Sequence, residues 1–154
     1  MTNRRQVLGL LGGLAVGLVG GGVLAQGKPS VLKGLEASLY KSPTCGCCGG
    51  YADFLKAQGV RVKVVMQEDL SPVKARYQIP QQAQSCHTVL IAGYVVEGHV
   101  PLEALQKLLR ERPKIDGIAL PGMPGGTPGM PGPKTGPYQV LQLQKGRTKP
   151  FLTL

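Results

Sequence analysis

The sequence predicts an α/β fold, because segments with the two-residue period of strands alternate with segments of helical period. The strand period is clearest over 60–66, where Val60, Val62 and Val64 share one face. The helical period is clearest over 101–112, where leucines form one apolar stripe, at Leu102, Leu105, Leu108 and Leu109. We expect that stripe to face a core.

The first half of the predicted fold is a strand, a cysteine-rich loop, a helix and a second strand. Residues 35–40 alternate as a strand does, and a Ser-Pro turn follows them. A helix is expected over 49–58, because its apolar residues recur at helical spacing and Gly59 is a typical stop. The valine alternation over 60–66 then gives the second strand, with Met66 as a core residue at its end.

The second half is a helix, a hairpin and a final helix. Ser71 is a candidate N-cap and Pro72 suits the first turn, so we expect a helix over 71–77. Strands at 88–91 and 94–97 are separated by two residues typical of a hairpin turn. The helix over 101–112 completes a β-α-β-α-β-β-α order, with two parallel crossovers before the hairpin. This order indicates a thioredoxin-like core.

The C-terminal part has a different composition. Most residues of 117–137 are Gly or Pro, and Met123 and Met130 lie among them. We expect no regular element there, and a loop of this length is usually functional or disordered. Two terminal strands, at 138–143 and 150–154, are expected to form a hairpin that holds this loop against the domain.

The N-terminus predicts export. Arg4-Arg5 precede an apolar run from Val7 to Leu24, and a small-residue cleavage site ends at Ala25. Residues 1–25 thus approximate a twin-arginine signal, with ordinary secretion and an uncleaved membrane anchor as alternatives. Residues 26–34 are expected to be a linker and 35–154 one metal-binding domain. The predicted location is the periplasm, with membrane contact only through an uncleaved signal.

The charge does not indicate a nucleic-acid partner. The formal net charge is +10, but the basic residues are dispersed and aromatic residues make up only 5% of the chain. Nucleic-acid sites usually cluster their basic residues and add aromatic side chains. We therefore expect a solvated basic surface.

All four cysteines converge on one predicted site. Cys45, Cys47 and Cys48 form a C-x-C-C cluster, and Cys86 stands beside His87. The cluster falls between the first strand and first helix, and Cys86 falls just before the third strand, so both should lie at one end of the sheet. Exported cysteines usually form disulfides. Three cysteines within four residues are poorly placed for disulfides that stabilise a fold by closing long loops.

The type of chemistry depends on Cys47. Thiols at a helix N-terminus can have their pKa lowered into the range of about 3.5–7.5, so Cys45 and Cys48 could serve disulfide exchange or metal binding. An extra thiol between them would scramble exchange. Adjacent cysteines also fit poorly into one tetrahedral zinc shell, whereas Cu(I) accepts few, soft ligands. A polynuclear Cu(I)–thiolate cluster is favoured.

Further soft or borderline donors are available nearby. The thioether of Met123 could close over a cluster from the Gly- and Pro-rich segment, or serve as an apolar plug. His87 could bind the metal or only orient the site. His99, at the end of the hairpin, could be a ligand or a partly exposed residue near the last helix.

The chain resembles the CopG-type copper-resistance proteins, a family of exported bacterial proteins. The resemblance covers roughly 35–143 and rests on four motifs in order: YKSPTCGCCG from Tyr40, SCHT from Ser85, GYVVEGHVP from Gly93 and LPGMP from Leu120. It implies a thioredoxin-like fold, a periplasmic location, a role in copper handling that is compatible with a copper redox step, and a cysteine-bridged copper cluster, at Cys45, Cys47, Cys48 and Cys86.

The leading hypothesis is therefore a periplasmic protein of copper resistance that sequesters Cu(I), with Met123 and His99 or His87 as auxiliary ligands. Whether it is also an enzyme stays open. The rivals are a thiol–disulfide oxidoreductase using Cys45 and Cys48, a protein that cycles Cu(I) and Cu(II), and a metallochaperone that passes copper to periplasmic copper-handling proteins.

Overall fold

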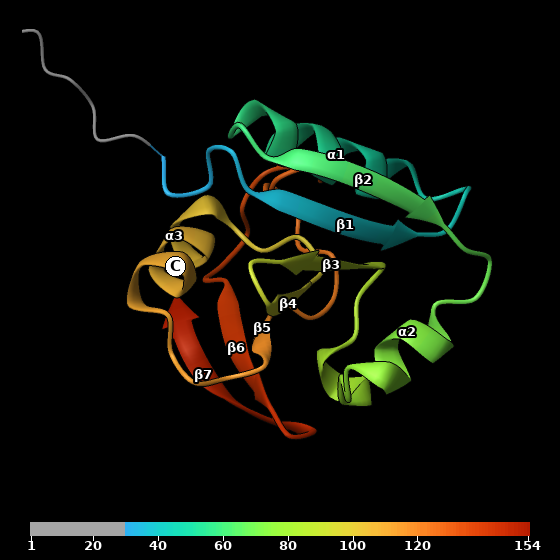
Figure 1. Ribbon diagram of the computed structural model, residues 1–154. Helices are drawn as coiled ribbons and strands as arrows, with labels where there is room; N and C mark the ends of the chain where they lie inside the picture. The colour runs from blue at the N-terminus through green and yellow to red at the C-terminus, as the bar shows by residue number, and fades with distance from the viewer. Residues whose placement is uncertain (1–29) are drawn as a thin grey trace, which may run out of the picture.

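A computed structural model describes residues 30–154, so the predicted export signal and the start of the linker lie outside the described residues. Three helices, a 3₁₀ turn and seven strands follow in chain order (Figure 1): β1 Glu36–Lys41, α1 Gly46–Ala57, β2 Arg61–Met66, α2 Ser71–Arg76, η1 Gln81–Ala83, β3 His87–Ile91, β4 Tyr94–Glu97, α3 Leu102–Glu111, β5 Gly117–Ala119, β6 Gln139–Gln144 and β7 Arg147–Thr153. The predicted α/β class is confirmed.

The strands form one mixed sheet in the order β2-β1-β3-β4-β5-β6-β7. β2 pairs with β1 in parallel, as the first crossover predicted. The prediction of a second parallel crossover is wrong. The connection from β2 passes β1, and β3 then pairs with the other edge of β1 in the antiparallel direction. Antiparallel pairing places His87, at the start of β3, opposite Lys41, at the end of β1. A parallel β3 would have begun at the other end of the sheet.

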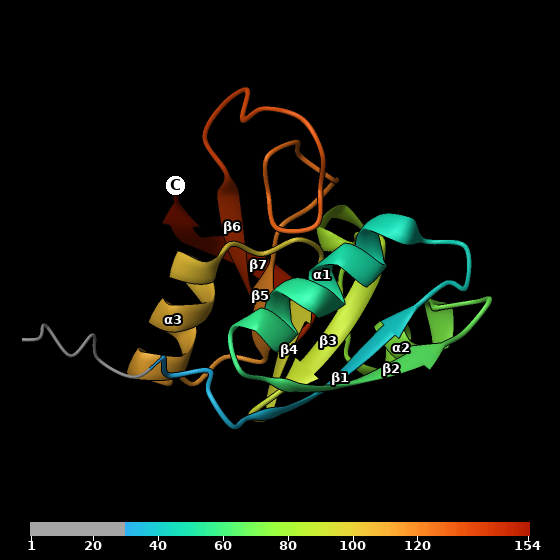
Figure 2. The same cartoon turned by 90° about the horizontal axis from the view of Figure 1, so that it is seen from above.

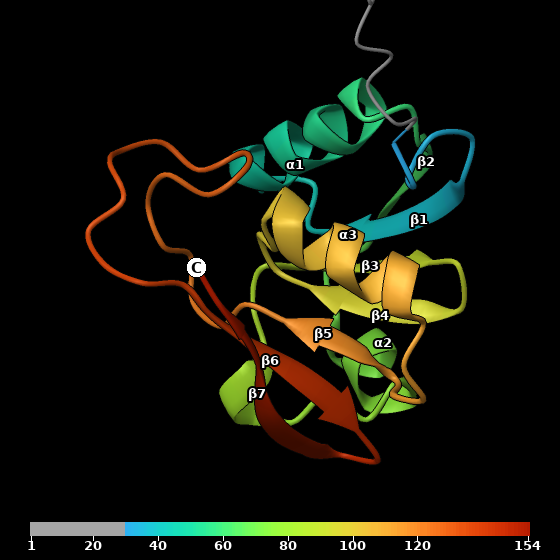
Figure 3. The ribbon, with the colours of Figure 1, turned by 90° about the vertical axis from the view of Figure 1, so that its left-hand side faces the viewer.

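The central strands β3, β4 and β5 are buried on both faces, and successive residues of β3 alternate between two cores. Val89 and Ile91 of β3 pack with α1 and α3 in the larger core. Leu90, between them, packs with the segment after α2 in the smaller core. Figure 3 shows the same division, with α1 and α3 on one side of the sheet and α2 on the other. The predicted leucine stripe of α3 faces the larger core.

Two expectations about local structure are wrong. Met66 is 63% exposed, because it ends β2 at the edge of the sheet instead of entering the core. Residues 117–119, expected to be irregular, form β5. Gly117 makes this strand possible, since a Cβ there would lie 1.9 Å from the carbonyl oxygen of Val95 on β4. Glycine within a strand often marks such a close approach between backbones.

The terminal segments are attached to the domain. Ser30 to Gly34 form a turn, and within it Leu32 is fully buried in the larger core. The predicted C-terminal hairpin is present as β6 and β7; β6 has the expected length, shifted by one residue, and β7 is longer than expected. In residues 30–154, no helix has both the length and the apolar character needed to cross a membrane.

Candidate metal site

Four sulfur atoms meet at the end of the sheet where β1 stops and β3 starts. Cys45 is the N-cap residue of α1, and Cys47 and Cys48 lie in its first turn. Cys86 immediately precedes β3. The four sulfurs all lie within 4.8 Å of one another, so the convergence expected from the sequence is present. It depends on the antiparallel β1–β3 pairing, which the sequence did not predict.

The cysteine cluster is partly oxidised in this structure. Cys45 and Cys48 form a disulfide, whereas Cys47 and Cys86 are free thiols. The sulfur of Cys47 lies 3.5 Å from that of Cys45, and the sulfur of Cys48 lies 3.6 Å from the carbonyl oxygen of Cys86. Two electrons and two protons must enter the disulfide before all four cysteines become thiols.

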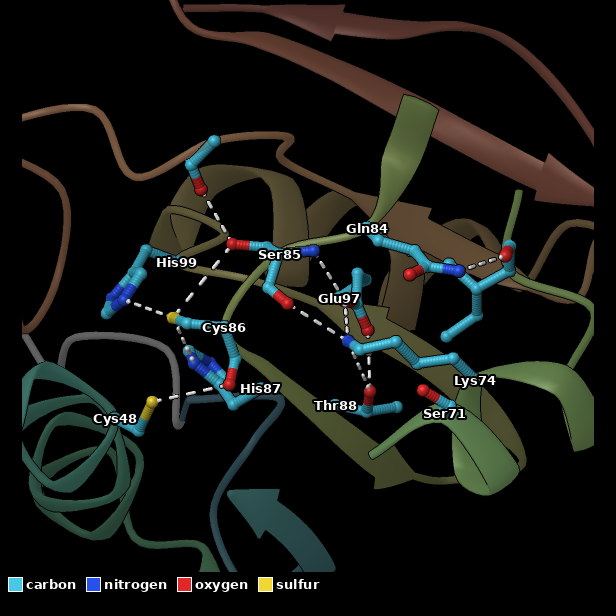
Figure 4. A network of polar contacts seen from close by, with 12 residues as sticks. Cys48, Ser71, Lys74, Gln84, Ser85, Cys86, His87, Thr88, Glu97 and His99 are labelled. Carbon is cyan, nitrogen blue, oxygen red and sulfur yellow. Dashed lines mark hydrogen bonds and ion pairs between the residues drawn. The ribbon is translucent and has the colours of Figure 1, made fainter. Parts of the chain in front are cut away.

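Two histidines complete the site around Cys86 (Figure 4). The Cys86 sulfur lies 3.3 Å from Nδ1 of His87 and 3.2 Å from Nε2 of His99. Both imidazoles are fully buried, so the expectation of a partly exposed His99 is wrong. The ring of His87 packs against that of Tyr51, with centroids 4.7 Å apart.

A glycine turn carries the chain from β4 into His99. Gly98 has a φ of +77°, and a Cβ there would lie 2.6 Å from the carbonyl oxygen of Leu120 and 2.7 Å from the Cβ of Ser85. Only glycine fits this conformation and this space. The turn aims His99 back toward Cys86.

Burial determines the protonation states of the site. Burial, together with the nearby Cys47, raises the pKa of the Cys86 thiol to about 11. Burial also lowers the pKa of His87 to about 3, with His99 and Lys74 contributing, and it lowers the pKa of His99. At neutral pH, Cys86 is therefore a thiol and both imidazoles are neutral, the form in which histidine binds metals.

A buried ion pair fixes the residue before Cys86. Lys74 of α2 pairs with Glu97 of β4, and both are largely or fully buried. The backbone N–H of Ser85 donates to Glu97 at 2.7 Å, and Lys74 donates to the Ser85 carbonyl at 3.0 Å. The hydroxyl of Thr88 donates to the second carboxylate oxygen at 2.6 Å. Burial raises the pKa of Glu97, against the effect of Lys74.

Sequence reasoning missed this network. A signal was present, because Glu97 is the one acidic residue in an otherwise apolar hairpin, and buried charges require partners. Figure 4 shows Lys74 and Glu97 beside Ser85, on the side away from Cys86 and Cys48.

The segment from Leu120 to Pro137, called the Gly/Pro loop below, borders the site. The Ser85 hydroxyl donates to the carbonyl oxygen of Gly122 at 2.6 Å. Met123 follows directly, but its side chain is 53% exposed. The structure therefore places Met123 at the rim of the site and not among the buried donors.

The donor set fits a soft metal ion. It combines four sulfurs with two neutral imidazoles, and Cys86, His87 and His99 form a second group whose donor atoms lie within 4.8 Å of one another. Sulfur and imidazole donors suit copper, whereas magnesium and calcium take oxygen ligands. In addition, Nε2 of His87 is buried and has no hydrogen-bond partner among the described residues.

The fold and the site together define an α/β protein with a thiol- and imidazole-rich candidate metal site. Two solved structures, titled "Copper resistance protein copG" Form 1 and Form 2, are each 39% identical to this chain with a TM-score of 0.71. They cover 78% of it, and the matches span 97% and 98% of their own chains. The chain belongs to this CopG-type family of copper-resistance proteins.

Two further comparisons complete this assignment. A family model described as "Protein of unknown function, DUF411" matches residues 83–130, the segment that contains Cys86, His87, His99 and Met123. No curated protein matches the chain.

Proposed function

We propose that this chain is a periplasmic copper-resistance protein that sequesters Cu(I) through Cys45, Cys47, Cys48 and Cys86. The observation that carries the proposal is the convergence of four sulfurs within 4.8 Å from segments 38 residues apart. The copper-resistance relatives support the choice of metal. Copper is here the cargo of the protein, and the predicted export signal at 1–25 supports the location.

Cu(I) suits this site for two reasons. It prefers soft sulfur and accepts low coordination numbers, so adjacent Cys47 and Cys48 need not complete one tetrahedral shell. Thiolates can also bridge ions, which would allow more than one copper in a site of this size. Met123 and His99 or His87 are the auxiliary ligands of the proposal, and the imidazoles are already neutral.

Loading requires two changes in the cysteines. The Cys45–Cys48 disulfide must be reduced by an external thiol or reductase, which supplies two electrons and two protons. The Cys86 thiol, with its pKa raised to about 11, must then lose its proton to the solvent as the Cu–S bond forms. Copper binding at neutral pH should therefore release protons.

A competition titration tests this proposal. The purified chain is reduced under anaerobic conditions and titrated with Cu(I) in the presence of a colorimetric Cu(I) chelator. We expect the chain to take copper from the chelator, and disulfide-bonded chain to compete far less well. Reduced chain that leaves all copper on the chelator would contradict the proposal.

The second candidate function is thiol–disulfide exchange, which the Cys45–Cys48 disulfide at the N-terminus of α1 favours. An insulin-reduction assay with dithiothreitol distinguishes the two. Turnover that survives the Cys47→Ser substitution would support an oxidoreductase. A copper-cycling variant of the main proposal predicts, instead, a reversible copper wave in voltammetry of the loaded chain.

A further inference from the structure

The Gly/Pro loop has a defined structure near its middle. The Thr127 hydroxyl donates to the carbonyl of Pro124 at 2.7 Å, and the Met130 N–H donates to the carbonyl of Thr127 at 2.9 Å. Tyr138, which begins the C-terminal hairpin, donates through its hydroxyl to the carbonyl of Gly125 at 2.8 Å. Thr127 is only 3% exposed. Residues 124–130 therefore form a fixed turn.

This turn packs against the first turns of α1 (Figures 2 and 3). Gly129 has a φ of +81°, and a Cβ there would lie 2.6 Å from the N of Tyr51 and 2.8 Å from the carbonyl oxygen of Cys47. A Cβ on Gly50 would in turn lie 3.1 Å from the Cα of Gly129. The contact joins backbone to backbone, and it exists because both residues are glycine.

The residue before Gly129 determines the tautomer of His99. The carbonyl oxygen of Pro128 lies 2.7 Å from Nδ1 of His99. A carbonyl can only accept, so Nδ1 must carry the proton. In a neutral imidazole, Nε2 then carries the lone pair, and this nitrogen faces the Cys86 sulfur at 3.2 Å.

The two histidines must then have different roles. A Cys86 thiol whose proton points to Nε2 of His99 leaves its sulfur free to accept the Nδ1–H of His87 at 3.3 Å. Nε2 of His87, which has no partner, is then a bare acceptor, whereas the other tautomer would bury an unpaired N–H. His99 thus offers a lone pair to the site, and His87 offers a proton.

We propose that the Gly/Pro loop is a positioning element: the Gly129–α1 contact holds the Pro128 carbonyl on His99 and makes His99 the metal-binding imidazole, with His87 as the hydrogen-bond donor to Cys86. Ligand-bound imidazoles usually donate their second N–H to such an acceptor, which fixes the tautomer and ring orientation. The metal part rests on the proposed function, but the tautomer is a property of the metal-free chain.

A matched pair of glycine variants tests this inference. Gly129 and Gly132 have similar positive φ angles, +81° and +88°, but a Cβ on Gly132 would meet nothing within 4 Å. Gly129→Ala and Gly132→Ala therefore add the same backbone strain, and only the first breaks the contact with α1. If Gly129→Ala does not fold, Gly50→Ala replaces it. Gly50 lies in α1 without a positive φ, and a Cβ there would crowd Gly129 from the helix side.

Two readouts are measured. Long-range ¹H–¹⁵N NMR of ¹⁵N-histidine-labelled, metal-free chain should show His99 protonated at Nδ1 in the wild type and in Gly132→Ala, and a tautomer mixture in Gly129→Ala. The Cu(I) affinity of reduced Gly129→Ala should fall by about 10–100-fold, the range for lost outer-sphere partners, with Gly132→Ala near wild type. His99→Gln should weaken copper binding more than His87→Gln.

The outcomes separate this inference from the proposed function. A wild-type His99 protonated at Nε2, or equal effects of Gly129→Ala and Gly132→Ala on both readouts, would overturn the positioning role. The expected NMR result in a chain that binds no Cu(I) would support the positioning of His99 and overturn its role as a copper ligand, together with the proposed function.

Discussion

The two halves of the site are built in opposite ways. The loop half, made of Cys45, Cys47 and Cys48, comes from one short stretch at the N-terminus of α1, and two of its sulfurs are joined in a disulfide. The buried half, Cys86 with His87 and His99, comes from the ends of two strands, and its imidazoles are fully buried. One half can change its redox state in place, and the other is held in a single arrangement.

The difference lies in the supporting contacts. The buried half is held by the Lys74–Glu97 pair behind Ser85 and by the Pro128 carbonyl on His99. The loop half depends on its own helix turn and on the backbone contact of that turn with Gly129. A site of this kind combines preorganised donors with donors that become available only on reduction.

Breaking the buried ion pair should have the largest effect. Glu97→Gln leaves the Lys74 ammonium buried without its counter-charge, so the free energy of unfolding should fall by about 3–5 kcal/mol. Urea unfolding measures this. Asp53→Asn, which removes the exposed partner of Lys56, is the control and should cost less than about 1 kcal/mol. Similar losses in both variants would mean that the pair does not support the site.

Removing one sulfur from each half sharpens the comparison. Cys86→Ser takes the only sulfur that links the loop half to the imidazoles, so Cu(I) affinity should fall more than about 100-fold, beyond the usual loss for outer-sphere groups. Cys47→Ser leaves two loop sulfurs and should have a smaller effect. Chelator competition on reduced chains gives both values. A larger loss in Cys47→Ser would reverse the ranking of the two halves.

Lowering the pH should reduce the free energy of unfolding through His87, in the buried half of the site. The pKa of His87 is lowered by burial to about 3, while in the unfolded chain it is about 6.5. Unfolded chain therefore binds more protons between these values. The stabilisation is complete above pH 6.5 and is lost as the pH falls toward 3, with a slope of up to about 1.4 kcal/mol per pH unit.

Urea unfolding from pH 7 to pH 4 measures this slope, and His87→Gln should flatten it. Glu97 acts in the opposite sense, because its raised pKa lets the folded chain take up a proton first as the pH falls. The difference between wild type and His87→Gln isolates the histidine. Parallel profiles for the two chains would show that His87 is not buried in its neutral form.

The smallest effect is expected at the contact between α1 and the segment that joins β4 to α3. The Tyr51 hydroxyl donates to the Val100 carbonyl at 2.9 Å. Tyr51→Phe keeps the ring against His87 and removes this hydrogen bond, so unfolding should become easier by about 1 kcal/mol. Copper affinity should stay at the wild-type value, and a clear loss of affinity would assign Tyr51 a role in the site.

The sequence predicted what is local and missed what depends on pairing. The leucine stripe of α3 and the valine alternation of β2 gave elements of the correct type, because periodicity is a local property. β5 was missed because glycine, here Gly117, is typical of a loop. The absence of a side chain at Gly117 is nevertheless what lets β4 approach closely enough to pair. Met66 was placed in the core because alternation does not show which strand lies at an edge.

The predictions about the site divide in the same way, into local features that the sequence shows and long-range contacts that it does not. The C-x-C-C spacing and the Cys86-His87 pair identified all four cysteines without a structure. The burial of His99, the ion pair of Lys74 and Glu97, and the carbonyl of Pro128 depend on the β3–β4 hairpin and on the path of the Gly/Pro loop. Contacts between residues far apart in the chain leave at most an indirect signal in a single sequence, such as the lone acidic residue Glu97 in its hairpin.

We propose that both halves of the site hold copper together, and copper-edge X-ray absorption on reduced, Cu(I)-loaded chain measures this. We expect more than one copper per chain, a first shell dominated by sulfur with a smaller nitrogen contribution, and a short copper–copper distance. Chain that retains no copper, or copper bound only to nitrogen and oxygen, would contradict it.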